Sequence, residues 1–572
     1  MNGAWQAIND DPTNFAAHRL LADGYSTEPR HEIARVSELL MSQLLQPTNV
    51  APIKPQLAQQ NLFIAQRAGP SHTSFDELTA PVVTNGLKLR ASAVTGDNGI
   101  AGDDVALAGL HDRLSYSVGH YRFATDGFRD NNDLEQSSVN AFVQYRTSQD
   151  TNLQFELRSA RMEHGDLTTY FNRDVYGAQL RFDEDADSLR LGAKHELTPR
   201  HTLLASVILQ DVANSGLNQD VFALLTNQKS YNVDVQEIFR ADGMTVQSGL
   251  VAAQGDETTE LTVFTPPGFD PLALSAAETN RQVALYSYVT FNPAPTVTVT
   301  AGASFDAIEV GPLQEDAVNP KLGLAWRPTA RTTLRAATFE TLYNGLTTSS
   351  QNAQPRLEPA QVAGFTQFLL GGRGDQTTVR GIGIEQELSP ELFVGWEAHS
   401  RRTERIVTTP LDPAQSSLQL TLRERAQQAY LYWMPLAQLS FSARYDSSRS
   451  SSEPTDFLGF SHLKTARLPL ELRYFARNGF SAGARASHVN QRGLFQVPAL
   501  TPFDAPTLAP GRDRFWVVDA FVGYRLPNRR GLLSVNADNL LDETFQFQDI
   551  DPTNPSLFPE RFVSLRFTLS FD

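Results

Sequence analysis

The segment FVSLRFTLSF, residues 562–571, ends one residue before the C-terminus and alternates between apolar and polar side chains. Successive side chains of an extended strand point to opposite faces. One face would therefore carry Val563, Leu565, Phe567, Leu569 and Phe571. The other would carry Ser564, Arg566, Thr568 and Ser570. An apolar face of this kind fits the core of a soluble sheet or the lipid around an outer-membrane β-barrel, so the rest of the chain has to decide.

The composition narrows the choice. The 572 residues carry a formal net charge of −16 and contain no cysteine. No run of 18 apolar residues occurs, which excludes membrane-spanning helices but not barrel strands, because such strands face lipid with only every second residue. The acidic charge argues against nucleic acid as a partner. The absence of cysteine excludes disulfide frameworks and thiolate metal sites.

From Gly86 onward the chain consists of alternating segments of about ten residues, such as LSYSVGHYRF, VNAFVQYR and FWVVDAFVGYRL. We count 24 such segments, joined alternately by short turns and by long polar connectors. This alternation is typical of the periplasmic turns and extracellular loops of a barrel. With 24 strands, the alternation of short and long connectors breaks twice. It is restored if two of the segments, residues 175–182 and 360–369, lie inside or beside long loops, which leaves 22 strands. The sequence therefore predicts an all-β transmembrane barrel of about 22 antiparallel strands over residues 86–572.

The residues before the barrel divide into two parts. Residues 1–47 carry apolar side chains at helical spacing, and the tripeptide PTN recurs at Pro12 and Pro47, close to the period of a tetratricopeptide repeat. We expect a truncated array of such repeats that begins inside a longer one, with an ordinary helical hairpin as the alternative. Residues 48–85 are rich in proline, alanine and glutamine and predict a linker or a segment that enters the barrel lumen.

The last 60 residues resemble the C-terminus of a TonB-dependent receptor, and the resemblance extends over about 490 residues. The segments FWVVDAFVGYRL (515–526), GLLSVNADNLLDETF (531–545) and RFVSLRFTLSF (561–571) have the order and spacing of that family's last strands. NPKLGLAWRP (319–328) and LEPAQVAGF (357–365) resemble strands and a re-entrant segment further round such barrels. The resemblance implies a 22-stranded barrel in the outer membrane. It also implies a globular plug before the first strand, and the 85 residues before the barrel do not fit one.

These expectations combine into three functional hypotheses. The first is passage or export of a large polar solute, with the helical repeats docking a periplasmic partner, a layout that resembles bacterial polysaccharide exporters. The second is a scaffold or surface-binding protein with a blocked lumen. The third is a TonB-dependent uptake receptor without its plug. In each case we expect the N-terminus in the periplasm, contact with outer-membrane lipid and lipopolysaccharide, assembly by the barrel-assembly machinery, and no cofactor.

A wide barrel needs something in its lumen. We expect residues 48–85 to occlude it partly from the N-terminal side, because QNLFIAQ offers apolar contacts and the prolines favour an extended path. The connectors 255–280 and 491–513 are expected to fold inward from the other side.

Other motifs give weak candidates for sites. GFSAG (479–483) matches the pattern of a nucleophile elbow around Ser481, but it begins a strand with no helix after it, so we expect no catalytic residue. Acidic loops are expected at GDNGIAGDD (96–104) and DEDAD (183–187). The first offers Asp97, Asp103 and Asp104 as weak candidate ligands for a hard cation, and the second offers Asp183, Glu184, Asp185 and Asp187. Solvated acidic turns are commoner, so no metal site is predicted.

Overall fold

A computed structural model gives the arrangement of most of the chain. It describes residues 2–26, 28–48, 50, 85–219, 221–265, 270–343, 354–369, 371–408, 417–453, 460–497, 507–551 and 555–571. In the described part of the chain, no helix is both long enough and apolar enough to cross a membrane.

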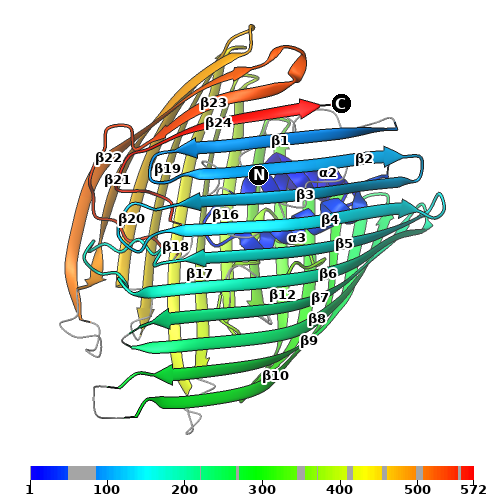
Figure 1. Cartoon of the computed structure of the whole chain (residues 1–572). Coiled ribbons are helices and arrows are strands. Elements are labelled where there is room, and N and C mark those ends of the chain that lie inside the picture. Colours follow the sequence, from blue (N-terminus) through cyan, green and yellow to red (C-terminus); the bar gives the residue numbers. More distant parts are fainter. Residues whose placement is uncertain are drawn as a thin grey trace.

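The strands from Gly86 onward form one closed antiparallel barrel of 22 strands (Figure 1), as the sequence predicted. The first are β1 (Gly86–Gly96), β2 (Ala101–His111), β3 (Leu114–Thr125), β4 (Leu134–Arg146), β5 (Thr151–His164), β6 (Leu180–Thr198), β7 (His201–Asn218), β8 (Phe222–Ala241), β9 (Met244–Val263), β10 (Leu272–Ala294) and β11 (Val297–Val310). The others are β12 (Leu313–Thr329), β13 (Thr332–Leu342), β16 (Gln376–Ser389), β17 (Leu392–Thr408), β18 (Ser417–Leu436), β19 (Leu439–Glu453), β20 (Phe460–Phe475), β21 (Phe480–Gln496), β22 (Leu508–Arg525), β23 (Gly531–Asp538) and β24 (Phe562–Phe571).

Each strand pairs with its neighbour in the chain, and the last strand closes the circle. β24 pairs on one side with β23, where Leu565 faces Val535, and on the other with β1, where Phe571 faces Leu89. Short turns join β2 to β3, β4 to β5 and so on to the short 3-10 helix Pro527–Arg529 between β22 and β23. The long connectors lie at the opposite end, which we call the loop end.

The connector between β13 and β16 contains the small hairpin of β14 (Gln361–Val362) and β15 (Phe365–Thr366), which pair only with each other. Residues 360–369 therefore lie inside a long loop, as expected. Residues 175–182 were only partly assigned correctly, because β6 already begins at Leu180.

Several strands are longer than the ten residues expected. The five strands from β6 to β10 have 19, 18, 20, 20 and 23 residues. Two predictions are corrected by these lengths. Residues 255–280 do not fold inward as a loop, because Gly255 pairs with Asn280 in the β9–β10 ladder. The second is corrected only at its ends, because the ladder of β21 and β22 covers 491–496 and 508–513, whereas 498–506 lie outside the described residues.

Three helices precede the barrel strands in the chain: α1 (Asn2–Asp10), α2 (Phe15–Tyr25) and α3 (Glu32–Leu45). The Asn14 side chain caps α2 by accepting a hydrogen bond from the Ala17 backbone N–H at 3.1 Å. α2 and α3 pack as an antiparallel pair through their buried apolar faces, with Leu21 and Tyr25 against Ile33 and Ala34. Figure 1 shows the helices enclosed by the barrel strands.

Candidate functional site

The three helices fill much of the lumen, and they contact the wall on several sides. Hydrogen bonds or ion pairs join them to β4 and β5, to β8, to β18 and to β19. We call α1–α3 together the helical layer.

The end of α3 is held to the wall by paired amide groups. The Gln46 side chain donates to the Gln144 side chain at 3.1 Å, and Gln144 donates back to the Gln46 carbonyl at 3.0 Å. Gln154 donates to the Gln43 carbonyl at 2.6 Å, and Arg190 donates to the Gln43 side chain at 3.2 Å. These hydrogen bonds satisfy part of the buried polar groups, whereas Gln43 Nε2 and Gln46 Oε1 have no partner among the described residues.

The turn between α2 and α3 carries the ionic contacts. Arg30 pairs with Glu424 of β18 at 2.8 Å, and Glu28 pairs with Arg444 of β19 at 3.2 Å. The Arg30 backbone N–H also donates to Asp551 at 3.3 Å, in the connector between β23 and β24. At the start of α2, Arg240 of β8 donates to the Thr13 hydroxyl at 2.8 Å.

The apolar face of α3 packs against the inner wall of β7 and β8. The buried cluster consists of Leu40, Met41, Leu44, Leu45, Leu204, Ile238 and Leu357. Leu44, Leu204, Ile238 and Leu357 are completely buried. The contact between helix and wall is therefore mixed, with an apolar centre flanked by amides and ion pairs.

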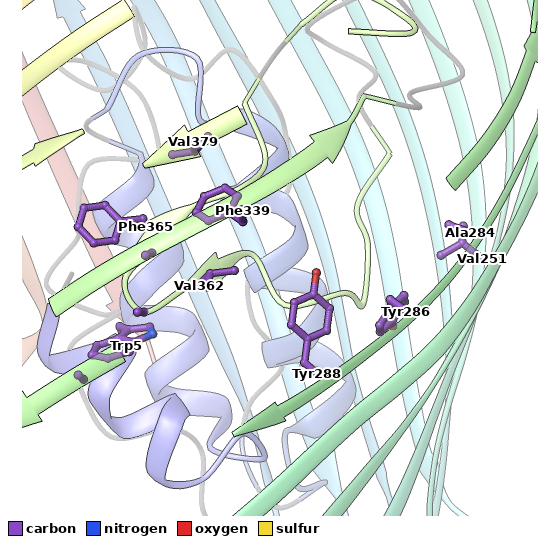
Figure 2. Packing of buried hydrophobic residues seen from close by; sticks show 12 residues of the cluster. Trp5, Val251, Ala284, Tyr286, Tyr288, Phe339, Val362, Phe365 and Val379 are labelled. Atoms are coloured by element: carbon purple, nitrogen blue, oxygen red, sulfur yellow. The ribbon is translucent and has the colours of Figure 1, made fainter. Parts of the chain in front are cut away.

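A second cluster joins α1, the β14–β15 hairpin and the wall (Figure 2). It contains Trp5, Val251, Ala284, Tyr286, Tyr288, Ala325, Ala337, Phe339, Val362, Ala363, Phe365 and Val379. The guanidinium of Arg335 lies 5.9 Å from the ring centre of Trp5 and 5.1 Å from that of Phe365. It also donates to Glu397 at 3.0 Å, so one wall arginine links α1, the hairpin and β17.

Two long connectors fold inward over the helical layer. In the first, between β13 and β16, Gln236 donates to the Leu357 carbonyl at 2.6 Å, and Tyr288 donates to Glu358 at 2.5 Å. The Arg356 backbone N–H donates to the Ser37 hydroxyl of α3 at 3.0 Å. This connector therefore bonds to the wall below it and to the helical layer beside it.

The second inward connector lies between β23 and β24. Its residue Gln548 exchanges two hydrogen bonds with Gln491 of β21, at 2.7 and 2.9 Å. Phe545 stacks on Phe515 of β22 with ring centres 4.0 Å apart. Among the described residues, the connectors that fold into the lumen are thus 354–375 and 539–561, and 255–280 is not one of them.

A cavity of about 80 Å³ remains between the helical layer, the β13–β16 connector and the wall. Its cationic lining consists of Arg30, Lys321, Arg356, Arg401 and Arg405. Its carboxylates are Asp306, Glu358, Asp375 and Glu424. A space of this volume holds several water molecules or a small ion. No large solute fits in it, nor in a second cavity of about 60 Å³ between the helical layer and the wall.

Two groups of the helical layer have displaced pKa values. Burial alone lowers the pKa of His18, but the Glu38 carboxylate at 2.5 Å and the Pro12 carbonyl at 2.9 Å outweigh burial, so the pKa is raised. Burial, and then the neighbouring Asp551 carboxylate, raise the pKa of Glu32 to about 7. The charge on the layer therefore depends on pH.

The structure places the residues of the closing strand on two faces. On the outer face, Leu565, Phe567 and Phe571 are 42%, 39% and 51% exposed, and Val563 and Leu569 are half-buried. Arg566 lies on the inner face and is buried. From Val563 to Phe571, the two faces thus separate apolar from polar side chains.

The candidate cation ligands do not come together. Asp97 accepts a hydrogen bond from the Val563 backbone N–H, Asp103 pairs with His120 at 2.9 Å, and Asp104 pairs with Arg90 at 2.9 Å. Asp103 and Asp104 are neighbours on β2, so their side chains point to opposite faces. Within the described ranges, no three His, Asp or Glu side chains are grouped so that they could hold a metal ion.

The second acidic motif is not a loop, which corrects the prediction. Asp183, Glu184, Asp185 and Asp187 lie on β6, because the β6–β7 ladder continues through them. Asp183, Asp185 and Asp187 are exposed, and Asp185 pairs with Arg161 at 2.9 Å. Ser481 is the second residue of β21, and its hydroxyl donates a hydrogen bond to the Gly523 carbonyl at 3.4 Å.

Comparison with known proteins shows what the barrel resembles. Residues 91–366 match the family model described as "TonB dependent receptor-like, beta-barrel". Among the curated proteins compared, none matches the chain.

Solved structures match far more of the chain, at low identity. The ferripyoverdine receptor of the Pseudomonas aeruginosa outer membrane is 13% identical, with a TM-score of 0.64 over 85% of this chain and 72% of that one. The FrpB iron transporter of Neisseria meningitidis is 12% identical, with a TM-score of 0.64 over 85% and 81%. The ferric-catecholate import receptor Fiu of Escherichia coli is 12% identical, with a TM-score of 0.60 over 85% and 82%. The chain therefore has the fold of an outer-membrane β-barrel of the TonB-dependent receptor type.

Sequence reasoning missed the residues that fill the lumen. It predicted the helices but expected them outside the barrel, and it assigned the lumen to residues 48–85. Residues 51–84 lie outside the described part of the chain, so that assignment stays a prediction. The signal that could have located the helices is the apolar stripe Leu40, Leu44 and Leu45 on α3, which has to be covered by another element.

Proposed function

We propose that this protein is a gated outer-membrane passage for a polar solute, and that the helical layer is the gate. The observation that carries the proposal is that the helical layer, which precedes the barrel strands in the chain, lies inside the 22-stranded barrel, and that two cavities beside it measure only about 80 and 60 Å³. Barrels of this size are wide enough to transport large solutes, and they need an occluding element when closed. Opening the passage then requires the layer to leave or rearrange.

The polar inner face of the barrel wall is evidence that the solute is polar. Five buried polar groups on the inner faces of β3 and β4 have no hydrogen-bond partner among the described residues: Ser115, Ser117, Gln136, Ser138 and Asn140. Buried groups of this kind are satisfied by water or by a polar partner. A polar wall favours passage of a hydrated or hydroxyl-rich solute over an apolar one.

The mixed interface between layer and wall also supports gating. Its amide pairs and ion pairs can exchange their partners for water when the layer moves, whereas a purely apolar contact would lose its burial. A periplasmic partner that captures residues 1–47 would then hold the passage open. Docking of such a partner, and an N-terminus that faces the periplasm, belong to the proposal.

The test links the helical layer to the barrel wall with an engineered disulfide. No other disulfide can form, because the chain contains no cysteine of its own. A Cβ at Gly192 of β6 would lie 2.8 Å from Leu44 Cδ2 of α3, so Leu44→Cys with Gly192→Cys puts two thiols at a direct contact between α3 and the wall. Planar-bilayer conductance is measured in urea below the concentration that unfolds the barrel, where local elements open first. The unmodified protein should change from closed to open. The oxidised double variant should stay closed, and reductant should restore opening.

The controls are Leu44→Cys alone and the reduced double variant, which should open like the unmodified protein. Equal conductance with and without the disulfide would refute the helical layer as the gate. Absence of conductance in every form, at every urea concentration, would refute passage and favour the scaffold with a blocked lumen.

Energised uptake of a metal complex is a second candidate. The matched structures are named as iron transporters and import receptors, and that similarity supports it. Under this alternative, periplasmic TonB acts on the chain, and a ferric chelate binds at the loop end. Isothermal titration of the purified protein with ferric chelates and with the iron-free chelators distinguishes it: iron-dependent binding supports uptake, and its absence leaves the gated passage.

A further inference from the structure

A row of cationic side chains crosses the outer face of five adjacent strands. Cross-strand pairing places Arg425 of β18 opposite Arg449 of β19, Arg449 opposite Lys464 of β20, Lys464 opposite Arg492 of β21, and Arg492 opposite Arg512 of β22. We call these five residues the basic row. The four arginines are exposed, and Lys464 is partly exposed.

The basic row lacks counter-charges of its own. None of its five members forms an ion pair with another described residue. Other outward arginines differ, since Arg122 pairs with Glu135 at 2.6 Å and Arg161 pairs with Asp185 at 2.9 Å. Like charges directly opposite each other on neighbouring strands are destabilising. Five in succession therefore need an external anion to neutralise them.

The basic row lies at a definite level of the barrel. Arg449, Lys464, Arg492 and Arg512 are each four residues from the loop end of their strands. Four residues further toward the short turns lie Tyr445 and Trp516, which are 43% and 47% exposed. Exposed tyrosine and tryptophan mark the membrane–water interface. The row therefore stands at the headgroup level of the leaflet on the loop side.

An apolar depression on the outer face adjoins the row. Arg425 and Arg449 form part of its lining, and its apolar lining includes Leu322, Leu324 and Ile382. Arg380 of β16 also lines it, and Arg380 connects to Arg425 through Ser400 of β17 in the cross-strand register. Cations beside an apolar hollow fit a ligand that has anionic groups at one end and acyl chains at the other.

From the register and the depression, we infer that the basic row is a binding site for a phosphorylated glycolipid of the outer leaflet, a molecule of the lipid A class. Its phosphates lie across the arginines and Lys464, and an acyl chain lies in the depression. Arginine suits this role because its planar guanidinium donates two parallel hydrogen bonds to a phosphate. The inference rests on the barrel and its membrane, and it is independent of what passes through the lumen.

The test measures lipid retained by the purified protein in detergent. Native mass spectrometry follows binding of bis-phosphorylated lipid A and of its dephosphorylated analogue. The unmodified protein should retain the phosphorylated form and release the other. Arg449→Gln with Arg492→Gln should lower retention of the phosphorylated form at least tenfold. Arg122→Gln with Arg161→Gln, which removes the same charge from ion-paired arginines, should leave it unchanged.

Heat-modifiable migration on gels shows which variants are folded. If the row variant fails to fold, preference of the unmodified protein for the phosphorylated lipid still decides the question. Equal binding of both lipids by the unmodified protein would overturn the inference, as would unchanged retention in a folded row variant. Either result would leave an acidic protein surface as the occupant of the row.

Discussion

A single arginine shows how the last strand is oriented. Arg566 is buried on the inner face of β24, between the exposed Leu565 and Phe567 on the outer face. The alternation of FVSLRFTLSF predicted these two faces, because side-chain direction in a strand follows from sequence parity alone. Parity could not predict which residues pair across strands. Asp104 was therefore a candidate ligand in the sequence, and only the β1–β2 register shows that Arg90 neutralises it.

Substitution on the two faces should have unequal effects. Leu565→Arg places a charge on the lipid face, which costs about 2–4 kcal/mol near the middle of the bilayer. Asn536→Arg on β23 places the same side chain in the lumen, at a half-buried position opposite Ser564. We expect Leu565→Arg to reduce heat-modifiable barrel sharply and Asn536→Arg to leave it near normal. Equal loss from both would contradict the assigned facing.

At the scale of an element, the apolar pattern of a helix predicts the helix but not the surface against which it packs. Apolar residues at helical spacing predicted α2 and α3, but such a stripe does not say what covers it. Here β7 and β8 cover it, through Leu204 and Ile238 of the barrel wall. The same holds for the connectors, because inward folding of 354–375 depends on distant partners such as Gln236. Both features follow from contacts between residues far apart in the chain.

The helical layer should loosen as the pH rises. The raised pKa of His18 means that its protonated form stabilises the layer. That contribution is complete below the unfolded value of about 6.5 and is lost as the pH rises through the folded pKa. Glu32 acts in the same direction, since its pKa is raised from 4.5 to about 7 and its ionisation over that range costs folding free energy.

We therefore expect hydrogen-exchange protection factors in α2 and α3 to fall as the pH rises from 4.5 to about 7, through Glu32, and to fall further above 6.5, through His18, with strand amides unaffected. Protection factors correct for the intrinsic effect of pH on exchange. His18→Gln with Glu32→Gln should flatten this dependence. A dependence that persists in the double variant would show that other groups control the layer.

At the scale of the whole molecule, the barrel wall is uneven in height. The 23 residues of β10 extend about 76 Å along the strand and, at a tilt of about 40°, rise about 58 Å. The apolar band of such a barrel is only about 25 Å tall. The strands from β6 to β10 therefore stand well above the membrane on the loop side.

The sequence predicted the number of strands, because a barrel needs an even number and its short and long connectors alternate. The polar residues DEDAD were nevertheless assigned to a loop, because a strand outside the membrane has no apolar, lipid-facing side.

This projecting wall supports the inward connector between β13 and β16. Arg373 of that connector donates to Glu257 of β9 at 2.6 Å, and both side chains are largely buried. Below that contact, Thr279 faces Asp256 in the ladder. Replacing residues 257–278 by an Asn-Gly turn would therefore shorten β9 and β10 without disturbing the part within the membrane.

The shortened protein should assemble normally, as heat-modifiable migration would show, because the removed residues lie above the apolar band. Trypsin cleavage after Arg373 should increase, because its carboxylate partner is gone. Glu257→Gln in the full-length barrel should increase that cleavage to a smaller degree, since the ladder remains and only the charge is lost. Failure of the shortened barrel to assemble would mean that β9 and β10 are needed within the membrane along their full length. Unchanged cleavage would mean that the connector is held from the lumen alone, through Leu357 and Glu358.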